Sequence, residues 1–157
     1  HDYRRFREGT LSLLANAFGS GAIGSYERAD DWRAATRLAG AGLQASGVAD
    51  SNYTDAMVAA IDELGPYMVI APGLALVHAR PSDAVAHTGM ALALFREPVK
   101  FGHAKNDPVH AVFALAALDH DRHLEVLADF VRVAGAENFV NSLLTCVTEG
   151  DIRALFQ

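Results

Sequence analysis

The sequence has only one cysteine, Cys146, among its 157 residues. One cysteine excludes an internal disulfide and any zinc site built from several cysteines, and it suits a reducing compartment. Cys146 stands within an apolar helical pattern, so we expect its thiol to pack in the core.

Long apolar runs and excess basic charge are also missing. No run approaches the roughly 18 to 20 apolar residues that cross a bilayer, and the start lacks the charged-then-apolar pattern of a secretion signal. We therefore expect a soluble, cytoplasmic protein. Lys and Arg number 13 against 19 Asp and Glu, a net charge of -6, which argues against a nucleic-acid partner. The absence of a Gly-x-Ser-x-Gly elbow argues against a Ser/His/Asp hydrolase.

The glycine-rich stretch Gly19–Gly24 matches the G-x-G-x-x-G dinucleotide pattern letter for letter. That site needs a buried strand before the glycines and an apolar helix opening within them. Here Leu11–Phe18 has the spacing of a short helix, and Ser25–Arg28 is too polar to pack on a sheet. We therefore expect no nucleotide site and no other cofactor.

The most informative stretch is Gly65–Pro81, in which two apolar runs flank a Pro72-Gly73 turn signal. The runs, Met68–Ala71 and Leu74–Val77, have the length and boundaries of short buried strands. The second run ends at His78, followed by Arg80 and Pro81. An imidazole at the rim of a sheet beside a guanidinium suits chemistry on an anion, although a histidine that only ends a strand is the simpler alternative.

The remaining apolar patterns predict an α/β fold. Apolar runs at Thr88–Phe95 and Ala111–Ala117 predict strands that are covered on both faces. Helical spacing predicts helices from Asp30 or Asp31 to Gly47, from Ser51 or Asn52 to Gly65, from Asp119–Asp121 to Gly135, over Glu137–Val147, and after a capping box at Thr148–Asp151. In the helix that ends at Gly135, we expect Leu124, Leu127, Val131 and Ala134 to face inward. The prediction is one domain, residues 1–157, folded as a three-layer sandwich with a mixed sheet of about five strands and helices on both faces.

The stretch Ile70–Pro81, which reads Ile-Ala-Pro-Gly-Leu-Ala-Leu-Val-His-Ala-Arg-Pro, resembles a known active-site signature. It is similar to that of the enzyme IIA components of the phosphoenolpyruvate:sugar phosphotransferase system, in the mannitol/fructose class. Two further matches follow in order: Glu97–Val99 with Asp107–Val109, and Leu115–Ala117 running into His123–Leu127. The resemblance covers roughly Asp31 to the C-terminus, and the run Gly-Pro-Tyr-Met-Val-Ile-Ala is more similar to the ascorbate-like branch.

The resemblance implies a phosphocarrier, a phosphotransferase component that forms a phosphohistidine at His78. In the family this histidine accepts a phosphoryl group from phospho-HPr and passes it to a cysteine of enzyme IIB, which serves a membrane enzyme IIC. Cys146 lies in no glycine-rich phosphate cradle, so we expect enzyme IIB to be a separate chain. Two local departures are Val77, where the family usually has proline, and the glycine-rich Gly19–Gly24, where the family has a strand. The sequence does not decide whether the protein forms a homodimer. It also does not identify the sugar, because the membrane component selects the substrate.

The second histidine of the family pattern corresponds to His123. It should fall in the first turn of the helix after the Ala111–Ala117 strand, and if that strand lies beside the one ending at His78, the two imidazoles approach each other. Phosphate on His78 would then meet an imidazole donor and the positive end of a helix. Arg80 adds a forked contact, and a backbone carbonyl is the expected partner of the second His78 nitrogen.

Two other functions use the same residues. A metal-dependent hydrolase would draw zinc ligands from His78, Asp119, His120, Asp121 and His123, but the His-Glu-x-x-His spacing is absent, and we expect no metal. A regulatory domain that senses phosphorylation is the second alternative, because such modules share the phosphorylated histidine. His87, His103 and His110 have no supporting pattern, and we expect them to be surface or structural histidines.

Overall fold

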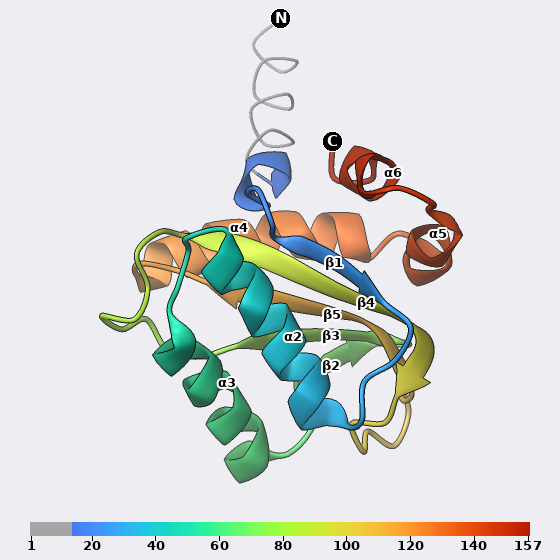
Figure 1. Ribbon diagram of the computed structural model, residues 1–157, viewed down its shortest axis with the longest axis horizontal. Coiled ribbons are helices and arrows are strands. Elements are labelled where there is room, and N and C mark those ends of the chain that lie inside the picture. Colours follow the sequence, from blue (N-terminus) through green and yellow to red (C-terminus); the bar gives the residue numbers. More distant parts are fainter. Residues whose placement is uncertain (1–13) are drawn as a thin grey trace, which may run out of the picture.

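The computed structural model describes residues 14–157, and in this part of the chain a five-stranded mixed sheet lies between helices (Figure 1). Helices α2 and α3 cross the near face of the sheet in Figure 1, and α4 passes behind it. The prediction of an α/β fold with helices on both faces is confirmed. The elements in chain order are β1 (Ile23–Tyr26), α2 (Trp32–Ala45), α3 (Ser51–Leu64), β2 (Val69–Ala71), β3 (Leu74–His78), β4 (Gly89–Val99), β5 (Val109–Ala116), α4 (His120–Ala134), α5 (Phe139–Thr145) and α6 (Glu149–Ala154).

The strand order in the sheet is β1-β4-β5-β3-β2. Strands β4 and β5 are central and antiparallel, and β5 pairs in parallel with β3. Their central position explains the nearly continuous apolar runs, because both faces of these strands are covered. Strand β2 turns back antiparallel onto β3 through Gly73, whose φ of 76° is accessible to glycine at little cost.

The two faces of the sheet are packed in different ways. Helix α2 approaches the sheet very closely at Gly42. A Cβ atom on Gly42 would lie 2.8 Å from the carbonyl oxygen of Ala22 and 2.9 Å from the Cβ of Ala91. On the opposite face Phe113 packs against Phe130 of α4, with ring centroids 4.7 Å apart. Backbone proximity on one side and aromatic rings on the other thus fix the two helical layers on the sheet.

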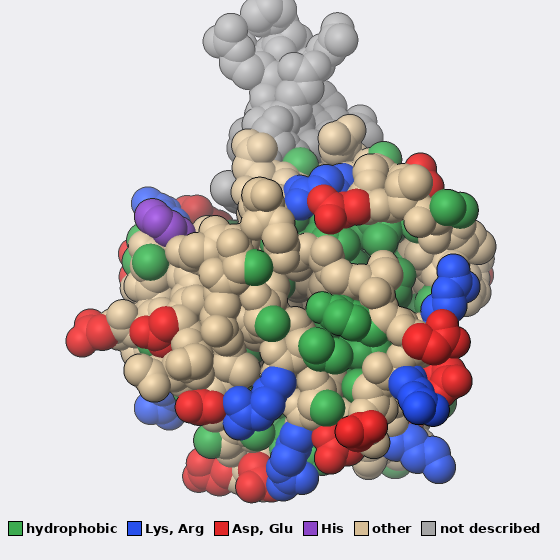
Figure 2. All heavy atoms as spheres, in the orientation of Figure 1, with side chains coloured by type: hydrophobic (Ala, Val, Ile, Leu, Met, Phe, Trp, Pro, Cys, Tyr) green, Lys and Arg blue, Asp and Glu red, His purple; other side chains and the backbone are tan. Residues whose placement is uncertain are grey.

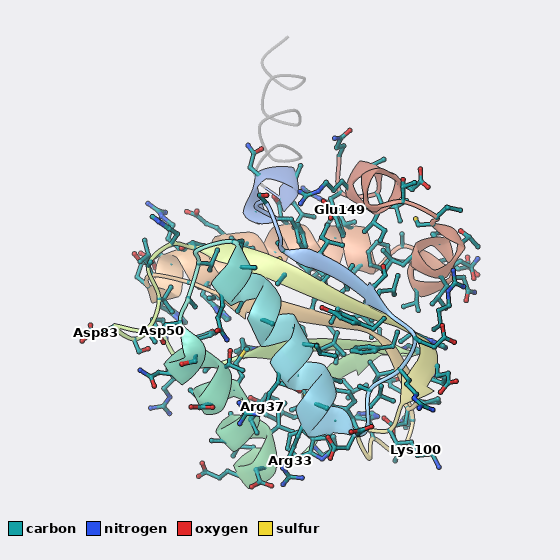
Figure 3. The ribbon with its side chains drawn as sticks, viewed as in Figure 1. Arg33, Arg37, Asp50, Asp83, Lys100 and Glu149 are labelled. Carbon is teal, nitrogen blue, oxygen red and sulfur yellow. The ribbon has the colours of Figure 1, made fainter. Side chains whose placement is uncertain are left out.

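Ion pairs join α2 to α3 on the surface. Arg33 contacts Asp62 at 2.6 Å and Arg37 contacts Asp55 at 2.9 Å, with all four side chains exposed to solvent. Figure 3 shows Arg33 and Arg37 beside the gap between the two helices, and Figure 2 shows red and blue side chains gathered along the same lower rim. Exposed pairs of this kind contribute about 1 kcal/mol at most, so buried contacts hold the helices in place.

The segment after the glycines corrects one prediction. Residues 14–17 are helical and no strand precedes Gly19–Gly24 in the described part of the chain, but Ile23–Tyr26 forms strand β1, parallel to β4. The expectation that Ser25–Arg28 is too polar to pack on a sheet is therefore wrong for Ser25 and Tyr26. Because β1 is an edge strand, polar side chains can face water while Tyr26 stacks on Phe95 at 5.6 Å. Residues 11–13 of the predicted first helix lie outside the described residues.

The inward face of α4 is also corrected. Leu127 and Ala134 pack partly buried against the core as predicted. Leu124 and Val131 are instead 49% and 51% exposed, whereas Val126, Asp129 and Phe130 are buried. The stripe is rotated relative to the prediction because Phe130 fills the space over Phe113. The other boundaries need smaller changes: Asp50, not Ser51 or Asn52, caps α3, and β4 continues to Val99 beyond an irregularity that accommodates Pro98.

Three further predictions concern single features. The capping box at Thr148 and Asp151 is present. Cys146 is half-buried and packs against the core. Within residues 14–157, no helix is both long and apolar enough to cross a membrane.

Candidate functional site

His78 is the last residue of β3. The four residues before it are buried, and His78 itself is half-buried where the strand leaves the sheet. Val77, which stands in place of the proline expected from the resemblance, continues the strand in register with Ala114 of β5. The substitution therefore leaves the approach to His78 in regular strand geometry.

His123 reaches the same place from α4. Asp119 caps this helix by accepting a 2.8 Å hydrogen bond from the backbone N–H of Arg122, and His123 lies in the first turn. Because β5 lies beside β3, the helix that follows β5 starts next to His78. The ring centroids of His78 and His123 are 5.2 Å apart. The predicted approach of the two imidazoles is present in the structure, beside the positive end of α4.

The two ring nitrogens of His78 have different environments. Nδ1 is buried and has no hydrogen-bond partner among residues 14–157, so the expectation of a backbone carbonyl partner is wrong. A buried nitrogen is inaccessible to a substrate, which leaves Nε2 as the atom that can act at the surface. A neutral imidazole with its proton on Nδ1 has a free lone pair on Nε2, and that is the form a nucleophile needs.

An open groove of about 960 Å³ surrounds these histidines. Arg80 lines it from the segment after β3, is exposed, and forms no ion pair with another described residue. The Tyr67 ring stands edge-on to His78, with centroids 6.4 Å apart. His78, His123 and Arg80, the predicted site residues, thus share one groove. The charge of Arg80 is available to an anion because no carboxylate of residues 14–157 pairs with it.

The groove has an apolar rim that sequence reasoning missed. Leu64, Tyr67 and Leu124 line it with 65%, 47% and 49% of their surface exposed. Leu64 and Leu124 had the helical spacing of core residues, a prediction that their exposure contradicts, and Tyr67 follows the Gly65-Pro66 signal that only marked the end of a helix. The only sequence feature that could have indicated this rim is that Tyr67 lies in the same stretch, Gly65–Pro81, as His78. Exposed apolar side chains around a polar centre are typical of a protein-binding surface.

The local environment keeps His123 neutral near pH 7. Burial lowers the pKa of His123, and the nearby positive charges that His78 and His120 can carry lower it further. A neutral His123 still has one ring N–H with which it can donate a hydrogen bond. An anion placed between the rings would reverse this effect and favour protonation of His123.

The zinc alternative finds little support in this geometry. Among residues 14–157 no group of three or more His, Cys, Asp or Glu side chains is placed to hold a metal ion. Asp119 uses its carboxylate as a helix cap. Of the other histidines, His103 accepts backbone hydrogen bonds within its own loop and His110 lies 2.8 Å from the carbonyl oxygen of Phe95, so both are structural as expected.

Comparison with known proteins places this geometry in context. Residues 18–157 match the family model described as "Phosphoenolpyruvate-dependent sugar phosphotransferase system, EIIA 2". The ascorbate-specific PTS system EIIA component of Shigella boydii is 36% identical over 128 residues, which cover 81% of this chain and 83% of that protein.

Solved structures share the fold. The mannitol-specific cryptic phosphotransferase enzyme IIA CmtB of Escherichia coli has a TM-score of 0.82 and 28% identity, covering 91% of this chain and 97% of that one. The E. coli mannitol enzyme IIA, solved in complex with phosphorylated mannitol enzyme IIB, has a TM-score of 0.75 and 23% identity, covering 88% and 95%.

Proposed function

The chain belongs to the EIIA 2 family of the phosphoenolpyruvate-dependent sugar phosphotransferase system, and we propose that it carries the phosphoryl group on Nε2 of His78. The observation that carries this proposal is the pairing of His78 with His123, whose ring centroids lie 5.2 Å apart in an open groove. The strand end gives the nucleophile a fixed direction, and the second imidazole provides a donor.

In the proposed reaction Nε2 attacks the phosphorus of phospho-HPr in line with the leaving histidine. A bond forms between phosphorus and Nε2 of His78, and the bond between phosphorus and the HPr nitrogen breaks. Little covalent assistance is needed, because phosphoryl transfer depends on position and on charge compensation. His123 donates to an equatorial oxygen, and Arg80 compensates the charge that these oxygens carry in the transition state.

The second half of the proposed cycle passes the group to a cysteine of a separate enzyme IIB, which serves a membrane enzyme IIC. Donor and acceptor must reach the same nitrogen, so they use the groove in turn. The apolar rim of Leu64, Tyr67 and Leu124 offers one surface for both. A complex of this kind exists for the E. coli mannitol enzyme IIA, which has the same fold.

We further propose that the enzyme IIB partner is of the ascorbate type, within the mannitol/fructose class of enzymes IIA. Support comes from the Shigella boydii relative, named ascorbate-specific, with 36% identity over 81% of this chain. The mannitol-specific CmtB is 28% identical. Partner choice follows the residues that surround the groove, so the nearer relative is the better guide to the partner.

The test is a reconstituted transfer chain. The protein is phosphorylated with radiolabelled phosphoenolpyruvate, enzyme I and HPr, then mixed with purified ascorbate-type or mannitol-type enzyme IIB. We expect label to move to the ascorbate-type protein at a higher rate. Faster transfer to the mannitol-type protein would overturn the partner assignment, and failure to label this chain at all would overturn the carrier function. His87→Ala serves as the control, since His87 is exposed and outside the groove.

A further inference from the structure

The hydroxyl of Tyr53 lies between the ends of the two strands that meet at His78. Tyr53 belongs to α3 and only 1% of its surface is exposed. Its oxygen is 3.0 Å from the backbone nitrogen of Ala79, the residue directly after His78, and 2.7 Å from the carbonyl oxygen of Leu115. Leu115 is the residue of β5 that pairs with His78. One side chain from a helix thus contacts both strand ends.

The donors and acceptors of these contacts follow from chemistry. The backbone N–H of Ala79 can only donate, so the Tyr53 oxygen accepts from it. The single hydroxyl proton is then donated to a carbonyl, and that of Leu115 is nearer than that of Ala79, at 2.7 Å against 3.1 Å. Burial raises the pKa of Tyr53 to about 12, although the hydrogen bond from Ala79 opposes this rise. The hydroxyl therefore keeps its proton over the physiological pH range.

We propose that Tyr53 is a positioning residue for His78, fixing the backbone at Ala79 and thereby the direction in which the imidazole leaves the sheet. A second observation points the same way. A catalytic imidazole is usually oriented by a hydrogen bond on its other nitrogen, but His78 Nδ1 has no partner among residues 14–157. Its orientation must therefore come from the backbone and from packing, and Tyr53 holds that backbone.

Removal of the hydroxyl has a definite structural consequence. In Tyr53→Phe the N–H of Ala79 and the carbonyl of Leu115 lose their shared partner in a buried place. They either stay unpaired or bond directly to each other, which draws β3 toward β5 at its last residue. The first outcome releases the backbone after His78 and the second shifts it, so either changes how His78 is held relative to His123, now 5.2 Å away. A displacement of about 1 Å in a reacting group can slow a reaction up to about a hundredfold, so we expect a roughly tenfold to hundredfold loss of transfer rate.

The experiment compares Tyr53→Phe with the wild type in the full chain by two readouts. The first is the ¹⁵N and ¹H NMR of the His78 and His123 rings in the unphosphorylated protein, including the contacts between their ring protons. The second is the rate of phosphoryl acceptance over a range of phospho-HPr concentrations. Two controls separate positioning from general loosening: Tyr26→Phe removes a hydroxyl on β1, and Ile61→Val trims a buried side chain on α3 itself.

We expect Tyr53→Phe to shift the His78 ring signals, weaken the contact with His123 and lower the maximal rate with little change in KM, while both controls resemble the wild type. His78 signals and rates equal to those of the controls would overturn the proposal. If Tyr53→Phe does not fold, replacing the backbone amide of Ala79 with an ester removes the N–H and keeps the side chain, and unchanged His78 signals in that variant overturn the proposal equally. The rate readout depends on the proposed function, but the NMR readout does not. A wild type that is never phosphorylated thus refutes the carrier function while the ring signals still decide the role of Tyr53.

Discussion

Loss of the His123 imidazole should destabilise phosphorylated His78 far more than the unphosphorylated protein. With the rings 5.2 Å apart, His123 can donate to an oxygen of a phosphoryl group on Nε2 of His78. A hydrogen bond to a charged group is worth about 1.5 to 3 kcal/mol. If the phosphate also draws a proton onto His123, opposite charges about 5 Å apart at an effective dielectric constant of about 20 attract by about 3 kcal/mol.

These values set the size of the effect. Each 1.36 kcal/mol is a factor of about ten in an equilibrium, so the range is roughly tenfold to a hundredfold. His123 is half-buried and water screens part of the interaction, so we expect His123→Ala to fall near tenfold. His123→Gln keeps a donor of similar reach and should retain most of the stability.

The assay is the equilibrium with phospho-HPr, followed with the hydrolysis rate of the isolated phosphoprotein. His87→Ala is the matched control, because it deletes an exposed histidine outside the groove. Phosphoprotein of equal stability in the wild type and in His123→Ala would show that the two histidines do not cooperate. Equal losses in His123→Ala and His123→Gln would show that donation is not the cause.

Arg80→Ala should slow transfer in both directions by roughly tenfold without unfolding the protein, and Arg80→Lys should be intermediate, because one charge remains but the fork is lost; unchanged stopped-flow rates would make Arg80 a plain surface residue. Asp119→Ala should lower the free energy of unfolding in urea by about 1 kcal/mol, because the cap on α4 is lost, and Asp119→Ser should recover most of it; identical losses in the two variants would exclude capping as the cause. Because the pKa of His123 is lowered in the folded protein, the unfolded chain binds this proton more readily. The resulting stability is complete above the unfolded pKa of about 6.5 and is lost as the pH falls from there to the lowered folded pKa. Within that pH range, urea titrations should show the wild type losing stability more steeply than His123→Gln; parallel curves would contradict the shift.

The parts of the fold that depend on strong local patterns were predictable. Gly89–Phe95 of β4 and most of β5 are covered on both faces, so their residues are apolar almost without interruption. The capping box at Thr148 and the turn at Gly73 are equally local, because each depends on residues a few positions apart. Strand β1 was missed from its composition because an edge strand needs only one buried side, so Ser25 and Tyr26 carry no apolar signal.

The parts of the site that depend on strand order were predictable, whereas the parts that depend on side-chain packing were not. A strand ending at His78 and a helix starting near His123 meet once β3 and β5 are neighbours. The exposure of Leu124 depends on how α4 is rotated about its axis, which Phe130 decides by packing on Phe113. Tyr53 has the spacing of an ordinary core residue, and only its contacts with Ala79 and Leu115 distinguish it.

The central claim, that His78 carries the phosphoryl group, has one direct test. The protein is incubated with phosphoenolpyruvate, enzyme I and HPr, and intact mass is measured at neutral pH for the wild type, His78→Ala and His87→Ala. We predict the mass of one phosphoryl group on the wild type and on His87→Ala, and none on His78→Ala. A phosphoryl group retained by His78→Ala would contradict the assignment.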